Sequence, residues 1–138
     1  MGIFIERERC CEATFRDGGP YWHAYTSGKD TPLLFALRED LVFVMNVIAQ
    51  AAALFPEIRI IAFEVMNNHF HFVVSAEKEA VLAFWGFVRK RLSRFFPLVK
   101  DLLITLNQID DLGSLRNNIV YTNRNGYVAD RTHTPFSY

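Results

Sequence analysis

Two short runs of β-branched and aromatic residues, joined by a three-residue turn, most constrain how this chain can fold. The runs are Ile58–Val65 and His69–Ser75, and the turn between them is Met66-Asn67-Asn68. Residues of this kind favour strands, and two such runs separated by a turn pair as an antiparallel hairpin. The sequence therefore predicts at least one pair of antiparallel strands.

Apolar periodicity and turn residues predict the other elements. The expected elements, in chain order, are a strand Tyr21–Thr26, a helix Arg38–Phe55, the two hairpin strands, a helix Ala80–Phe96 capped by Ser75, a short strand Leu102–Leu106, and a helix from Leu115 to about Asn125 that stops at Gly126. The apolar face of the second helix is expected to comprise Leu82, Trp85, Val88, Leu92 and Phe95. This order predicts an α+β fold, an antiparallel sheet with helices packed on one face in a ferredoxin-like sandwich, and an opposite face free to carry a site.

Length and composition limit the class of protein. A chain of 138 residues suits a single domain over 1–138, and a hydrophobic content of 51% with thirteen Phe excludes a disordered chain. The most apolar stretch, Leu41–Phe55, is interrupted by polar residues and is shorter than the roughly 18 to 20 residues of a membrane span. Adjacent Cys10 and Cys11 fit neither a disulfide framework nor a zinc site, and the charged N-terminus fits no signal peptide, so we expect a cytoplasmic protein.

The net charge is zero, but the charges are unevenly distributed. Residues 1–84 contain 7 basic and 11 acidic residues, whereas residues 85–138 contain 8 basic and 4 acidic ones. The C-terminal part is therefore the expected face for a polyanion, although asymmetry of this size also arises by chance. The candidate phosphate contacts are Arg89, Lys90, Arg91 and Arg94 on the second helix and Arg124 on the last.

His69 and His71 are two residues apart in a predicted strand. Alternation places both imidazoles on one face of that strand. Two imidazoles on one face can converge on a divalent ion, preferably Mn²⁺ or a later transition metal rather than Mg²⁺. A His-x-His pair is also common on strands as a surface or core feature, so the pattern alone leaves both interpretations open.

Tyr121 and Asn125 are four residues apart in the last predicted helix, so they share a face, which Asn117 extends by one turn. A phenol beside a metal is a competent nucleophile toward phosphorus, and the Asn125 amide offers an oxygen ligand. The same spacing also fits a core tyrosine with asparagines at a helix end. His23 fits a strand or groove residue better than a ligand, and His133 fits a solvated loop residue.

Several of these segments resemble the single-tyrosine HUH transposases, in particular the REP-associated tyrosine transposases and the insertion-sequence-200 type. The hairpin sequence Phe63-Glu64-Val65-Met66-Asn67-Asn68-His69-Phe70-His71 follows the family's Tyr-x-x-Met-Pro-Asn-His-x-His, with Asn67 in place of Pro. The segment Tyr121-Thr122-Asn123-Arg124-Asn125-Gly126 keeps the Tyr and Asn of the family's Tyr-Ile-His-x-Asn-Pro without its His and Pro. The opening strand at Tyr21 and the turn Pro32-Leu33-Leu34-Phe35 are also similar, so the resemblance covers most of the chain.

The resemblance implies an RRM-like HUH-endonuclease sandwich that binds single-stranded DNA hairpins and cleaves and rejoins DNA. It implies that Tyr121 is the nucleophile of a 5′-phosphotyrosine intermediate. It further implies that His69, His71 and Asn125 bind Mg²⁺ or Mn²⁺, and that the protein acts as a monomer or homodimer away from membranes.

Other interpretations are weighed beside this one. A second register, with Gly126-Tyr127-Val128 on the family's Gly-Leu-Val, sets Asn117 at the nucleophile position, but an asparagine cannot attack a phosphodiester. The alternative function is a catalytically degenerate single-stranded nucleic-acid-binding domain of the same fold. A metal-dependent phosphodiesterase that uses water would need two His-x-Thr/Ser motifs, which the chain lacks, and a domain that only binds a partner is the remaining option.

Overall fold

The secondary-structure elements follow one another in the predicted order. The computed structural model describes the backbone of residues 20–129 and the side chains of residues 20–124. The elements are β1 (Tyr21–Tyr25), α2 (Arg38–Leu54), β2 (Arg59–Val65), β3 (Phe70–Ser75), α3 (Lys78–Ser93), the 3₁₀ helix η1 (Pro97–Asp101), β4 (Thr105–Ile109) and α4 (Leu112–Ala129). None of the helices in this part of the chain has the length and hydropathy needed to span a bilayer.

The four strands form one antiparallel sheet in the order β2-β3-β1-β4. With α2 between β1 and β2 and α3 between β3 and β4, this is the ferredoxin-like βαββαβ topology, and α4 follows it. Residues directly opposite each other on neighbouring strands project from the same face. Tyr25, His71 and Glu64 are such partners across β1, β3 and β2, so their side chains share one face.

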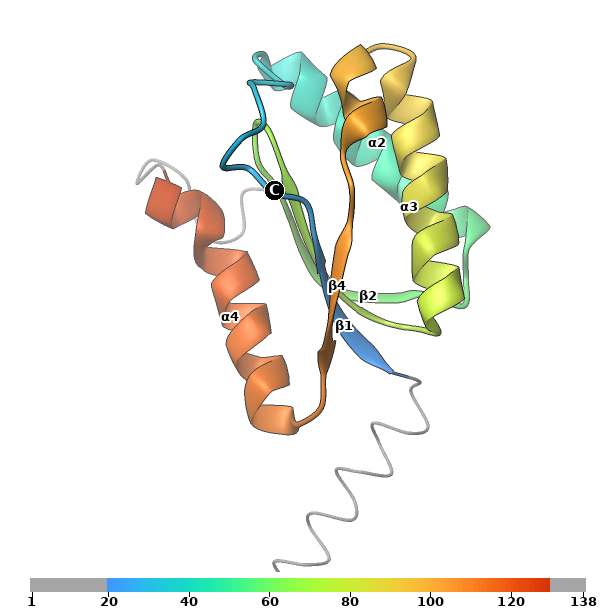
Figure 1. Cartoon of the computed structure of the whole chain (residues 1–138), viewed down its shortest axis with the longest axis vertical. Coiled ribbons are helices and arrows are strands. Elements are labelled where there is room, and N and C mark those ends of the chain that lie inside the picture. Colours follow the sequence, from blue (N-terminus) through green and yellow to red (C-terminus); the bar gives the residue numbers. More distant parts are fainter. Residues whose placement is uncertain (1–19, 130–138) are drawn as a thin grey trace, which may run out of the picture.

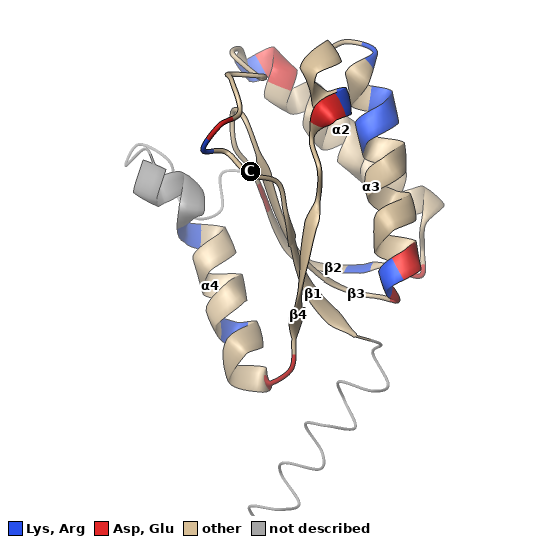
Figure 2. Cartoon of the chain, in the orientation of Figure 1, with Lys and Arg blue, Asp and Glu red and all other residues tan. Residues whose placement is uncertain are grey.

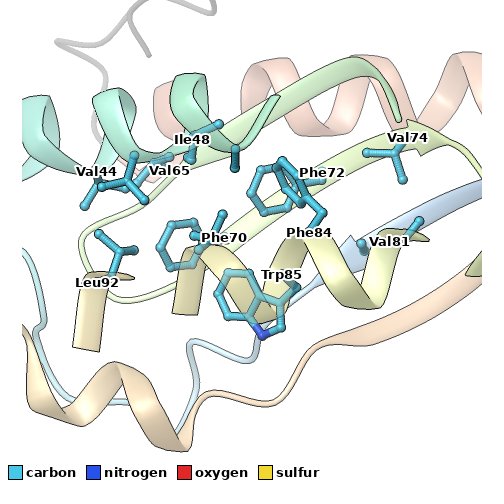
Figure 3. Close-up of a cluster of buried hydrophobic side chains, with 14 of the residues drawn as sticks. Val44, Ile48, Val65, Phe70, Phe72, Val74, Val81, Phe84, Trp85 and Leu92 are labelled. Carbon is cyan, nitrogen blue, oxygen red and sulfur yellow. The ribbon is translucent and has the colours of Figure 1, made fainter. Parts of the chain in front are cut away.

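Helices cover both faces of this sheet, as Figure 1 shows. The larger core lies between the sheet and the pair α2 and α3, where Phe70, Phe72 and Trp85 are buried (Figure 3). On the opposite face, α4 packs against β2 and β3 over a smaller apolar cluster. The buried residues of that cluster are Ala62, Val73 and Ile109, with Tyr21, Leu115 and Ile119 packed against them.

The α+β class and the antiparallel ferredoxin-like sheet are confirmed, but the placement of all helices on one face is wrong for α4. The reason is that the second face of the sheet is itself apolar where Ala62 and Val73 lie, and α4 carries the matching apolar residues Leu115 and Ile119. Burying these two surfaces against each other removes apolar area from water. The face that was expected to be free is therefore partly covered.

The details of α3 also differ from the prediction. Ser75 is the last residue of β3, and Glu77 occupies the N-cap position without a side-chain capping bond. Leu82 and Phe95 are 44% and 66% exposed, whereas they were expected to be buried. Trp85, Val88 and Leu92 are buried as predicted, and Val81 and Phe84 complete the buried stripe in place of Leu82 and Phe95.

The last strand, β4, and the last helix, α4, have different boundaries from the predicted ones. The predicted strand Leu102–Leu106 begins only at Thr105, because Leu102 closes the η1 turn by donating its N–H to the Val99 carbonyl and is buried in the larger core. α4 begins at Leu112, earlier than the expected Leu115, and continues through Gly126. A single glycine inside a helix costs only about 1 kcal/mol, so it does not end the helix.

Candidate active site

The sheet face beneath α4 carries a cluster of three histidines, His23, His69 and His71, which we call the histidine cluster. His23 lies on β1, His71 lies on the neighbouring β3, and His69 immediately precedes β3. Strand alternation places His71 and His23 on the same face because their positions are offset by two residues in the β1–β3 register. The predicted His69 and His71 pair is therefore extended by a third imidazole from another strand.

Direct contacts join the members of the histidine cluster. His23 Nε2 lies 3.1 Å from His71 Nδ1, at hydrogen-bond distance, and the two rings are nearly parallel with centroids 5.4 Å apart. The His69 and His71 rings meet edge to face with centroids 5.1 Å apart. The Tyr25 ring stacks on His23, with centroids 4.9 Å apart. These contacts restrict how each imidazole can turn.

Tyr121 lies on α4 above the histidine cluster. Its ring meets His71 edge to face, with centroids 5.7 Å apart, and His23 at 6.3 Å. Tyr121 is 55% exposed, so this side chain is open to solvent while its ring contacts two histidines. The structure thus brings together Tyr121, His69 and His71, which are far apart in the sequence.

The turn before β3 and the loop after β1 hold His69. Asn68 Oδ1 lies 2.6 Å from His69 Nδ1, and Asn68 Nδ2 donates to the carbonyls of Gly28 and Thr31 at 3.0 and 2.9 Å. A Cβ added to Gly28 would lie 2.5 Å from His69 Nδ1, so the close approach of loop and imidazole requires glycine. Sequence reasoning did not single out Gly28, although it is the one residue type that allows this contact.

Burial favours the neutral form of all three histidines. It lowers the pKa of His23 and of His69 below the ordinary value of 6.5. It lowers the pKa of His71 to about 4, and the charges of His69 and His23 add to this effect. Neutral imidazole is the form that binds a metal ion, so the protonation state suits the ligand role expected for His69 and His71.

Glu64 is a buried carboxyl group that sequence reasoning did not single out. It is the cross-strand partner of His71 and is 5% exposed. Burial raises the pKa of Glu64 to about 7. The only sequence signal was an acidic residue within the apolar run that follows Arg59 in this strand.

The donors near Tyr121 define what kind of metal site could form. Within residues 20–124, no group of three or more His, Cys, Asp and Glu side chains is arranged to hold a metal ion. A site built on His69 and His71 therefore needs a donor of another kind, and the predicted third ligand, the Asn125 amide, is such a donor. Asn125 lies on α4 one turn after Tyr121, but its side chain is outside the described residues.

The basic residues predicted to contact DNA divide between two faces. Arg89, Lys90 and Arg91 lie near the end of α3 and Arg94 follows it, on the sheet face opposite the histidine cluster (Figure 2). Arg124 is exposed on α4, three residues after Tyr121. Asn117, the alternative nucleophile position, is exposed on the same helix. His133 lies outside the described residues.

Comparison with known proteins relates this fold to a transposase. A REP-associated tyrosine transposase bound to a REP hairpin superposes with a TM-score of 0.64 over 82% of this chain and 69% of that chain, at 16% sequence identity. The chain has the fold of a REP-associated tyrosine transposase. A candidate transposase from Deinococcus radiodurans R1 matches with a TM-score of 0.49 and 15% identity, over 83% of this chain and 91% of that one. No family model and no curated protein matches the sequence.

Proposed function

We propose that this chain is a DNA strand transferase, which binds single-stranded hairpins and cleaves and rejoins one strand through Tyr121. The observation that carries the proposal is the contact between Tyr121 and His71, with ring centroids 5.7 Å apart, in a transposase fold. The solved transposase with this fold is bound to a REP hairpin, which supports a hairpin as the substrate.

The proposed reaction exchanges one phosphoester bond for another. The phenol oxygen of Tyr121 attacks the phosphorus and gives up its proton to solvent. The bond between phosphorus and the 3′ oxygen breaks, and this oxygen takes up a proton to become a free 3′-hydroxyl. The 5′ end of the cut strand is left as a phosphate ester of Tyr121. Attack of another 3′-hydroxyl on this ester reverses the step and joins two strands.

His69, His71 and Asn125 are the residues that would hold a divalent cation, Mg²⁺ or Mn²⁺. Such an ion polarises the phosphoryl oxygen and lowers the cost of forming the phenolate. The two imidazoles fit this role because both are neutral near pH 7 and both already use Nδ1 in a hydrogen bond, which leaves Nε2 for the ion. Imidazole donors favour Mn²⁺ over Mg²⁺, so Mn²⁺ is the ion for a first assay.

The basic residues would contact different parts of the DNA. Arg124 shares a helix with Tyr121 and lies three residues after it, so it is placed to contact phosphates near the cleaved one. Arg89, Lys90 and Arg91 belong to α3, and Arg94 ends it, and this helix covers the other side of the sheet (Figure 1). They would contact only DNA that extends past the sheet, such as the stem of a hairpin.

The test is formation of a covalent adduct. The protein is incubated with Mn²⁺ and a panel of 3′-labelled hairpin oligonucleotides, and the products are separated on a denaturing gel. We expect an adduct with the wild type and none with Tyr121→Phe. Tyr25→Phe is the matched control, because it removes the phenol of the other tyrosine near His71, whose ring centroid is 6.0 Å away, and should keep the adduct.

The position of the label tests the polarity of the bond. A 5′-phosphotyrosine link retains the 3′-labelled fragment, whereas a 5′-labelled substrate should release a free oligonucleotide that a polymerase can extend. An adduct lost in Tyr25→Phe and kept in Tyr121→Phe would show that the nucleophile is misassigned. Hairpin binding without any adduct would instead favour the catalytically degenerate nucleic-acid-binding domain.

A further inference from the structure

We infer that Asn68 and His23 are positioning residues that keep the proton of His69 and of His71 on Nδ1, so that both imidazoles present an unprotonated Nε2. The inference rests on the proposed function, because the use of these Nε2 atoms is to bind the cation. It nevertheless concerns a property of the metal-free protein that can be measured separately.

The hydrogen bonds of Asn68 determine the state of His69. The carbonyls of Gly28 and Thr31 can only accept hydrogen bonds, so the group that faces both of them must be the Asn68 Nδ2 amide. Asn68 Oδ1 therefore faces His69 Nδ1 at 2.6 Å, and an amide oxygen can only accept. The proton of this bond must belong to Nδ1, and the neutral His69 ring carries its lone pair on Nε2.

The loop between β1 and α2 fixes this arrangement. The Thr31 N–H donates to the Gly28 carbonyl, which closes a turn and directs the carbonyls of Gly28 and Thr31 toward Asn68. Gly28 itself packs against the His69 ring, where no Cβ would fit. A flipped His69 ring would place a carbon atom against Asn68 Oδ1 and lose the hydrogen bond. The loop contacts and the Asn68 amide therefore hold the His69 ring in a single orientation.

His23 is the hydrogen-bond partner of His71 Nδ1, as Asn68 is of His69 Nδ1. The 3.1 Å contact between His23 Nε2 and His71 Nδ1 holds one proton, because two protonated nitrogens could not approach so closely. The ligand role proposed for His71 assigns that proton to its Nδ1, because only then does His23 accept the hydrogen bond and His71 keep an unprotonated Nε2 for the cation. His23 stacks against Tyr25, which supports the ring from the side of β1. Partners that bond the second nitrogen of a ligand histidine are known to fix its tautomer and orientation.

The direct test is the tautomer of each histidine in the metal-free protein, read from long-range ¹H–¹⁵N NMR spectra at pH 8. We expect the proton on Nδ1 in both His69 and His71. In Asn68→Ala, His69 should shift toward the Nε2-protonated tautomer, while the neighbouring Asn67→Ala, whose side chain is exposed, should leave it unchanged. A wild-type His69 or His71 protonated on Nε2 overturns the inference.

Three further variants keep the test decisive. Asn68→Asp loses the two bonds to the Gly28 and Thr31 carbonyls but retains an oxygen acceptor for Nδ1, and should therefore preserve the His69 tautomer. His23→Gln offers an amide oxygen to His71 and should preserve the His71 tautomer, whereas His23→Leu should not. If His69 loses its Nδ1 proton in Asn68→Asp, or His71 is unaffected by His23→Leu, the assigned partners are wrong.

Binding of Mn²⁺, measured by calorimetry, separates the inference from the proposed function. Loss of such a partner typically weakens metal binding roughly 10- to 100-fold, and we expect a loss in this range for Asn68→Ala and His23→Leu. If the wild type binds no Mn²⁺ but shows the expected tautomers, the cation site fails and the positioning roles stand. If Mn²⁺ binds equally well to the wild type and both variants, and the tautomers do not change, the positioning roles fail and the proposed function stands.

Discussion

Replacing Glu64 by Gln is expected to change how the stability of this protein depends on pH. Glu64 is 5% exposed on β2, and burial raises its pKa to about 7 from an ordinary 4.5. Gln has nearly the same shape but cannot ionise. The comparison of Glu64→Gln with the wild type therefore isolates the cost of placing a carboxylate in this part of the sheet.

The sign follows from the direction of the pKa shift. Because the folded protein binds the Glu64 proton more tightly than the unfolded chain does, Glu64 contributes stability that is fully present below pH 4.5 and is lost as the pH rises through 7. At about 1.4 kcal/mol per pKa unit, acidification from pH 8 to pH 5 should add about 2.5 kcal/mol to the wild type through this group. The variant should gain nothing from it.

The assay is urea unfolding of both proteins at pH 5 and pH 8, with a chelator present. Burying the Gln amide changes the unfolding free energy of the variant by the same amount at pH 5 and at pH 8. This constant therefore cancels when the two pH values are compared. Acid also destabilises the folded protein through His71, because burial lowers the pKa of that imidazole to about 4. This contribution is common to both proteins and cancels when their unfolding free energies are compared. A difference in unfolding free energy between the two proteins that is the same at pH 5 and pH 8 would refute a buried, ionisable Glu64.

Three further predictions concern the elements around the site. Thr122→Val should raise the unfolding free energy by about 1 kcal/mol, because the buried Thr122 hydroxyl has no hydrogen-bond partner among the described residues, whereas Thr122→Ser should not. Gly28→Ala should cost about 1 to 3 kcal/mol in urea unfolding and shift the His69 resonances, since the new Cβ displaces that ring; unchanged resonances would contradict the contact. Asp111→Ala should lower the urea midpoint and Asp111→Asn should largely keep it, because Asp111 accepts hydrogen bonds from the backbone N–H and hydroxyl of Ser114 at the start of α4.

The parts of the fold that local patterns predicted were largely correct. Alternation in the run His69–Ser75 placed His69 and His71 together, and helical spacing placed Tyr121 on a helix. The contact between His23 and His71 was not foreseen. The ferredoxin-like order already brings β1 beside β3, but the pairing of individual residues across these strands depends on the register, which local patterns do not determine.

The side of the sheet on which α4 packs was equally beyond local patterns. Both faces of this sheet are apolar enough to accept a helix, so an amphipathic stripe such as Leu115 and Ile119 does not indicate which one it will cover. The burial of Glu64 could not be recognised for the same reason, since its partner across the strands becomes known only with the register. The single domain over 1–138, the homodimer and the cytoplasmic location stay predictions.

The βαββαβ unit carries the histidine cluster and is complete without α4, which rests on it through a small apolar cluster. Contacts of that size give an element a lower local stability than the main core, so α4 should detach before the sheet unfolds. Substitutions in α4, Tyr121 included, can therefore accumulate while the sheet remains intact. In evolutionary terms, a protein with the proposed activity could give up DNA cleavage and retain its fold and its imidazoles, so descendants that bind DNA without cutting it would be readily accessible from this architecture.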